Sequence, residues 1–128
     1  MYNKASGQPF IGAVSLTTGS PGPVNIPIIT VPGGAPYTLA PTERLVITNI
    51  SVSSNDTAQP LVTLDDGATV PRLLAKYYTG AALPAANEAI PAGVCQGFLS
   101  KPLRATATAV TAAKTVEILV RGYVTQTV

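Results

Sequence analysis

Residue types that could carry catalysis are scarce in this chain. It contains no histidine, a single cysteine (Cys95) and six acidic residues. Without an imidazole, Cys95 lacks the usual group that activates a thiol, so we expect it to be buried as a small hydrophobic residue. The only adjacent acids, Asp65 and Asp66, precede Gly67, and this combination is typical of a chain reversal. A carboxylate pair assembled from distant strands stays open, but the pattern favours a protein that is not an enzyme.

Metal and cofactor motifs are also missing from the sequence. Structural zinc sites use four Cys or His ligands, and the chain has one such residue in total. Calcium could take oxygens from Asp56, Asp65 or Asp66, but their spacing is not that of a calcium-binding loop. No phosphate-binding glycine motif occurs either. We therefore expect no metal and no cofactor.

The composition predicts a surface that partner proteins cover. Charged residues make up 11% of the 128-residue chain, against roughly 25% in an average soluble domain, and the mean hydropathy is positive. No window approaches the ~20 apolar residues of a membrane-spanning helix. Lysines and arginines are spread along the chain rather than gathered as in a nucleic-acid site. We therefore expect protein partners, with no membrane and no nucleic acid among them.

Turn signals divide the chain into short segments rich in Val, Ile and Thr. None of these segments has the apolar period of a helix. Eight of these segments predict strands: residues 13–17, 24–31, 44–54, 60–64, 70–78, 95–100, 105–112 and 114–124. Their number and spacing predict an all-β fold, an antiparallel β-sandwich of about eight strands. The length fits a single domain, which we place at residues 11–128.

Two stretches lie outside this regular pattern. Residues 1–10 are polar, contain Gly7 and Pro9, and predict an extended N-terminal arm. Residues 79–93 form an Ala- and Pro-rich connection that is longer than most in a compact domain. Such a connection serves either as an interface or as a flexible loop, and the sequence leaves both readings open.

The two longest strands carry apolar residues on both faces. The expected core face, together with the hairpin strand beside it, supplies Val46, Ile50, Val52, Leu64, Val116, Ile118 and Val120. The opposite face of an exposed sheet ought to be polar, yet here it mixes apolar and charged side chains. We expect this face to contact other subunits through Leu45, Ile47, Leu119, Arg121 and Tyr123.

Four short motifs recur at intervals through the second part of the chain. They are I-S-V-S-S at 50–54, V-T-L-D-D-G at 62–67, P-L-R at 102–104 and V-R-G-Y at 120–123. Taken together, they resemble the small β-sandwich virion proteins of tailed phages. The resemblance implies a jelly-roll-like head decoration or cement protein on the capsid surface. It also implies a homo-oligomer, often a trimer, that is clamped over joints between major capsid protein subunits.

Composition and resemblance together predict a virion structural protein that stabilises the phage head. The first residues lack the apolar run of a signal peptide, so we expect assembly in the host cytoplasm. Within the arm, Tyr2, Lys4 and Phe10 are expected to reach an adjacent subunit or capsid protein. The alternative function is a phage tail or fibre component, a receptor- or carbohydrate-binding module with Tyr77 or Tyr78 and residues 79–93 at its site.

Overall fold

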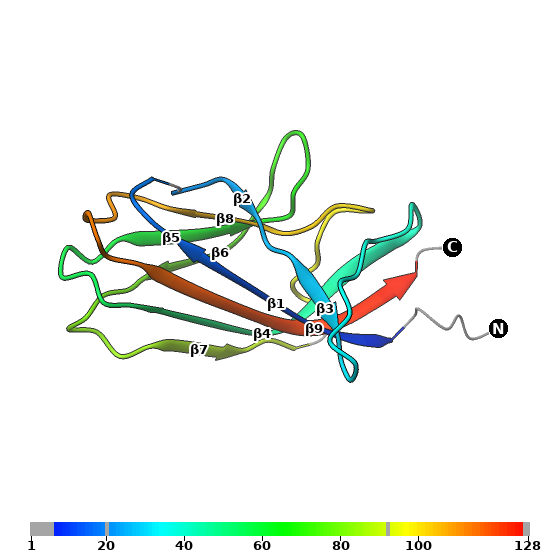
Figure 1. The fold of residues 1–128 in the computed structure, drawn as a ribbon. Coiled ribbons are helices and arrows are strands. Elements are labelled where there is room, and N and C mark those ends of the chain that lie inside the picture. The colour runs from blue at the N-terminus through cyan, green and yellow to red at the C-terminus, as the bar shows by residue number, and fades with distance from the viewer. Residues whose placement is uncertain (1–6, 20, 92, 127–128) are drawn as a thin grey trace.

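Two antiparallel sheets build the protein. The computed structural model describes residues 7–19, 21–91 and 93–126, which contain nine strands and no helix (Figure 1). The strands are β1 Gln8–Leu16, β2 Val24–Asn25, β3 Ile28–Thr30, β4 Glu43–Ser54, β5 Leu61–Asp65, β6 Leu73–Tyr78, β7 Ala86–Ala89, β8 Arg104–Ala107 and β9 Val116–Gln126. One sheet has the order β3-β1-β9-β4-β7 and the other the order β2-β8-β5-β6. The predicted β-sandwich is confirmed, whereas the jelly-roll topology stays a prediction.

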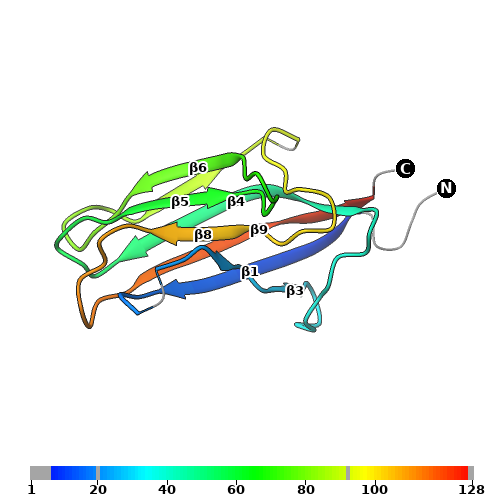
Figure 2. The ribbon, with the colours of Figure 1, turned by 90° about the horizontal axis from the view of Figure 1, so that it is seen from above.

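The hydrophobic core lies between the two sheets. Figure 2 shows β6, β5 and β8 of one sheet in front of β4, β9 and β1 of the other. All seven residues that the sequence placed in the core are buried, and six of them belong to one contiguous apolar cluster. The period-two alternation along β9 therefore identified its inward face correctly.

Most predicted strand segments contain a strand, with three differences. Residues 24–31 form two short strands in different sheets, because the chain crosses between the sheets at Ile26 and Pro27. Residues 95–100 form no strand, although Gln96 makes an isolated bridge to Val46 of β4. β7 lies within residues 79–93, where the sequence predicted only a connection. Its Ala, Asn and Glu residues have low strand propensity, which pairing with β4 overrides.

A bulge in β4 changes which of its residues face the core. The register between β4 and β9 shifts by one residue between Ile47 and Asn49, so Thr48 is an extra residue. Leu45 and Ile47 consequently point into the core, with exposures of 0% and 1%. Their predicted role in a subunit contact is therefore wrong. Val46 is buried too, but alternation places it on the other face and it lies outside the core cluster.

The sandwich begins earlier in the chain than the sequence predicted. Gln8, Pro9 and Phe10 belong to β1 and pair with β9. Phe10 is buried in the core cluster, so the prediction that it belongs to an arm and contacts another subunit is wrong. The other two residues assigned to that contact, Tyr2 and Lys4, lie outside the described residues.

Three connections gather toward the end of the sandwich where β1 begins and β9 ends, at the right of Figure 1. They are residues 31–42, 66–72 and 93–103, and we call this region the loop end. Backbone hydrogen bonds tie residues 93–103 to their neighbours: Phe98 donates to Asp66, and Ser100 donates to Glu43 at the start of β4. The loop end is thus an ordered surface.

Candidate interaction surface

The reversal between β5 and β6 is held by its two aspartates. Asp66 is buried, and its Oδ1 accepts the amides of Ala68 and Arg72, each at 3.1 Å. Asp65 Oδ1 accepts the amide of Gly67 at 2.8 Å, and Gly67 has the positive φ of 79° that the turn requires. Burial opposes ionisation of Asp66, but these amides and the Arg72 charge outweigh it and lower its pKa. The predicted turn role of the acidic pair is confirmed.

Apolar side chains project from the loop end into solvent. Val70 is 86% exposed, Val94 73%, Leu73 55% and Phe98 48%. Val70, Val94 and Phe98 come from two adjoining connections, where Phe98 donates its amide to Asp66 at 3.0 Å, and Leu73 is the first residue of β6. We call these four residues the exposed apolar set. Side chains of this kind, held in place on an ordered surface, are typical of a site that contacts a partner.

The charges around the exposed apolar set are mainly positive. Arg72, Lys76 and Lys101 are exposed and take part in no ion pair within the described residues. The two acids of the turn already have partners. Asp66 accepts hydrogen bonds from backbone amides, and Asp65 forms an ion pair with Arg104 Nε at 2.9 Å. This surface therefore presents apolar groups with cations beside them.

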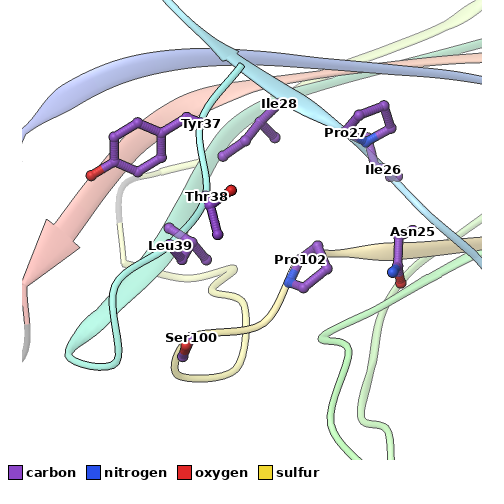
Figure 3. A pocket seen from close by; sticks show the side chains of 9 residues that line it. All are labelled: Asn25, Ile26, Pro27, Ile28, Tyr37, Thr38, Leu39, Ser100 and Pro102. Carbon is purple, nitrogen blue, oxygen red and sulfur yellow. The ribbon is translucent and has the colours of Figure 1, made fainter. Parts of the chain in front are cut away.

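A groove of about 350 Å³ opens beside the same connections (Figure 3). Its walls come from the β2–β3 crossover, the segment before β4 and the segment before β8: Asn25, Ile26, Pro27, Ile28, Tyr37, Thr38, Leu39, Ser100 and Pro102. No charged residue lines it. Sequence reasoning missed the groove because its walls come from three separate connections that only the folded chain brings together.

Tyr37 gives this groove a rigid wall. Its hydroxyl contacts both carboxylate oxygens of the buried Glu43 at 2.9 Å, and Glu43 Oε1 accepts the amide of Ala40 at 2.7 Å. Burial, followed by the hydrogen bond and charge of Glu43, raises the pKa of Tyr37 to about 12. The groove can accept an apolar side chain, but it offers no group for acid–base chemistry at neutral pH.

The outer face of the five-stranded sheet carries the remaining predicted contact residues. Leu119 and Tyr123 are half-buried and Arg121 is exposed, and all three lie on this face. Leu119 sits between the small residues Ala13 and Ser51 of the neighbouring strands. A shallow depression of about 330 Å³ lies beside it.

The two consecutive tyrosines do not form a stacking platform for a sugar. Tyr77 packs against the core, and its hydroxyl donates to Glu88. Tyr78 points to the opposite face of β6 and is exposed. The two rings point in opposite directions, as consecutive residues of a strand do.

The described residues contain no cluster of acids and cysteine that could hold a metal ion. Cys95 is buried as predicted; burial and the Glu88 charge raise its pKa, and the Arg72 charge opposes that rise. No helix in the described part of the chain is long and apolar enough to cross a membrane.

No family model, curated protein or solved structure matches the chain significantly.

Proposed function

We propose that the protein is a non-enzymatic structural component of a tailed-phage virion, a decoration or cement protein that bridges major capsid subunits. The observation that carries the proposal is the exposed apolar set on the ordered connections of the loop end. Covering these four side chains with a partner removes apolar surface from water, which favours association. The assignment to a phage head rests on the sequence resemblance, and the low content of charged residues fits a protein surrounded by partners.

In this proposal the loop end contacts the shell, and the outer face of the five-stranded sheet contacts other copies of the chain. Leu119, Arg121 and Tyr123 contribute to the contact between copies, and the resemblance favours a trimer. Binding to the assembled shell, but not to dissociated subunits, stabilises the shell by mass action. No bond needs to be made or broken.

Sedimentation equilibrium tests the oligomer. We expect a mass near three times the 13.1 kDa of the chain, and we expect Leu119→Ser to lower it. Ser15→Ala, a change on the same face that keeps it small and uncharged, is the control. A wild-type monomer at micromolar concentration contradicts the proposed oligomer.

The role in the virion is tested on purified particles, by quantitative mass spectrometry and by survival after heat or osmotic shock. We compare the wild type with the double variant Val70→Ser/Phe98→Ser and with Ala82→Ser, an exposed change in the β6–β7 turn at the opposite end. We expect many copies per particle, and loss of both attachment and particle resistance in the double variant alone. Deleting residues 1–6, which leaves β1 intact, tests the expected role of Tyr2 and Lys4.

A different outcome supports the tail or fibre alternative. If particles carry only a few copies, and the double variant changes host attachment while particle resistance stays the same, the protein is a receptor-binding module and the cement proposal is wrong.

A further inference from the structure

β6 is an outer strand whose second edge is open. Among the described strands its only neighbour is β5. Thr79 donates its amide to the carbonyl of Pro60 at 3.2 Å, and Thr108 donates to the carbonyl of Leu61 at 2.9 Å. Thr79 therefore faces β5, while Leu61, the partner of Tyr78, faces β8.

These two bonds fix the direction of the backbone groups in β6. Amide and carbonyl groups alternate from one edge of a strand to the other along its length. The N–H and C=O groups of Lys76 and Tyr78 consequently point away from β5, toward the open edge. Two residues of β6 thus offer donors and acceptors in the spacing that an added strand requires.

The side chains at this edge form an apolar, cationic and apolar sequence. Leu73, Lys76 and Tyr78 lie on the outer face of the four-stranded sheet, opposite Asp65, Thr63 and Leu61 of β5. All three are exposed. Asp65 is already paired with Arg104, so the Lys76 ammonium has no carboxylate partner within the described residues.

We propose that the open edge of β6 binds an extended segment of another protein, which adds to the four-stranded sheet as a further strand. The segment carries an acidic side chain beside Lys76 and apolar side chains beside Tyr78 and Leu73. Opposite charges and apolar pairs in neighbouring strands stabilise strand pairing. The inference rests on the proposed function only for where the partner is found, since the edge chemistry is a property of the free protein.

A second copy of β6 is a poor occupant of the same edge. An antiparallel pairing centred on Lys76 brings the lysines of two copies directly opposite one another, and like charges in that position are destabilising. Lysine on an edge strand is a common device against self-pairing. The same lysine attracts an acidic strand, so it selects between partners.

A lipid surface fits the edge less well than a protein strand. Lipid tails cannot hydrogen-bond the outward N–H and C=O groups of Lys76 and Tyr78. Attachment to an anionic membrane also favours clusters of ~4–8 basic residues, whereas the exposed cations on β6 and the residue before it are Lys76 and Arg72.

The probe is a capped synthetic peptide with the sequence Val-Thr-Glu-Thr-Val flanked by threonines, and the intact chain is the receptor. In an extended strand its glutamate and both valines lie on one face. Two further peptides are compared: one with lysine in place of glutamate, and one with alternate backbone nitrogens methylated so that it cannot complete a ladder. Amide hydrogen exchange and shift changes are followed by NMR. We expect the glutamate peptide alone to slow exchange at Lys76 and Tyr78.

Charge reversal at the edge supplies the second readout. We expect Lys76→Glu to weaken binding of the glutamate peptide by about fivefold or more and to favour the lysine peptide. Lys101→Glu changes the net charge equally but lies off the strand, and we expect it to keep the wild-type preference. Circular dichroism of both variants checks that they fold.

Several results overturn the inference. These are no binding of the glutamate peptide up to millimolar concentration, equal binding of all three peptides, or protection at β6 by phosphatidylserine vesicles instead. Self-association through β6, seen as protection that depends on protein concentration without peptide, also overturns it. If the peptide binds but the protein never joins particles, the proposed function fails and the inference about the β6 edge stands. If the protein joins particles but the peptide does not bind, the inference about the β6 edge alone is overturned.

Discussion

Tyr77 of β6 donates its hydroxyl hydrogen to the Glu88 carboxylate of β7, so a single bond joins the edges of the two sheets. The ring of Tyr77 packs against the core while its polar tip reaches the surface. The two strands are consecutive in the chain, and the connection between them carries it from one sheet to the other. The bond therefore links the two sheets at this side through two side chains.

Replacing Tyr77 by Phe removes that bond and keeps the ring. We expect the free energy of unfolding to fall by about 1 kcal/mol, the usual contribution of one hydrogen bond. Tyr78→Phe makes the same chemical change on an exposed neighbour, where we expect less than about 0.5 kcal/mol. Chemical denaturation compares the two, and equal losses would mean that the link between the edges contributes nothing.

Two of the five tyrosines should ionise late. Burial, followed by the bond and charge of Glu43, raises the pKa of Tyr37 to about 12, and burial followed by Glu88 raises the pKa of Tyr77. The folded protein holds these protons more tightly than the unfolded chain, whose tyrosines titrate near 10. The corresponding stability is fully present below about pH 10 and is lost as the pH rises through the folded pKa values.

Ultraviolet absorbance titration measures this effect. We expect a late component above the main tyrosine transition, reduced in Tyr37→Phe, together with a fall in unfolding free energy over the same alkaline range. One transition at the ordinary tyrosine pKa would contradict the arrangement around Tyr37.

Asp56 should make the protein sensitive to acid. Its carboxylate accepts the Thr111 amide at 2.7 Å, the Ala58 amide at 2.9 Å and the Thr111 hydroxyl at 2.8 Å. The amides of Thr111 and Ala58 lead the effects that lower its pKa from the ordinary 3.8. A lowered folded pKa gives stability that is present above the ordinary value and is lost as the pH falls through the folded value.

Asp56→Asn tests this dependence. We expect the variant to be less stable at neutral pH and to lose less further stability on acidification than the wild type does. Denaturation curves between neutral and acid pH measure both. If the unfolding free energies of the wild type and the variant differ by the same amount at every pH, the charge of Asp56 plays no part.

Gly122 allows β4 and β9 to approach closely beside the bulge. A Cβ atom at this position would collide with the carbonyl oxygen of Val46. We expect Gly122→Ala to cost about 1–3 kcal/mol, the usual range for forcing atoms into a packed site. Gly19→Ala is the control, because its added Cβ meets no atom within 4 Å. Equal unfolding temperatures for the two variants would contradict the close approach of β4 and β9.

The bulge at Thr48 determines which side chains of β4 are buried, so substitutions on the two faces of the five-stranded sheet should differ in their cost to stability. Ile47 and Ile118 are both buried in the core, so replacing either by Ala should cost about 2–5 kcal/mol. Leu119→Ala, on the half-buried outer face, should cost less than either in the monomer. A small loss at Ile47 would mean that the alternation does not shift.

The sequence was most informative where one pattern governs a whole element. Alternation in β9 identified its buried face, and Asp65, Asp66 and Gly67 identified the hairpin turn, because local side-chain chemistry decides both. The errors at Leu45 and Ile47 have one cause: a single extra residue inverts the alternation, and nothing in Thr48 itself marks it as a bulge. β7 was missed because its residues are poor strand formers that pair only once β4 is in place.

The candidate surface was harder to predict from the sequence than the core was. Leu119 and Tyr123 drew attention because they are apolar or aromatic on a strand face that also carries Arg121, and their role in a contact stays a prediction. Val70, Val94 and Phe98 lie in connections, where an apolar residue is buried or exposed according to how distant segments pack. The groove and the direction of the β6 backbone groups are likewise products of tertiary pairing, and no local pattern encodes them.

β9 is the last of the nine strands to leave the ribosome, and it is also the central strand of its sheet. Until it emerges, β1 and β4 have no common partner, and each exposes an apolar face and an unpaired edge. Closing the pair Gln8 with Val124 requires contact across almost the whole described chain, which slows folding. Chains stalled or cut before β9 should therefore aggregate or be degraded, so that only chains containing β9 join any assembly.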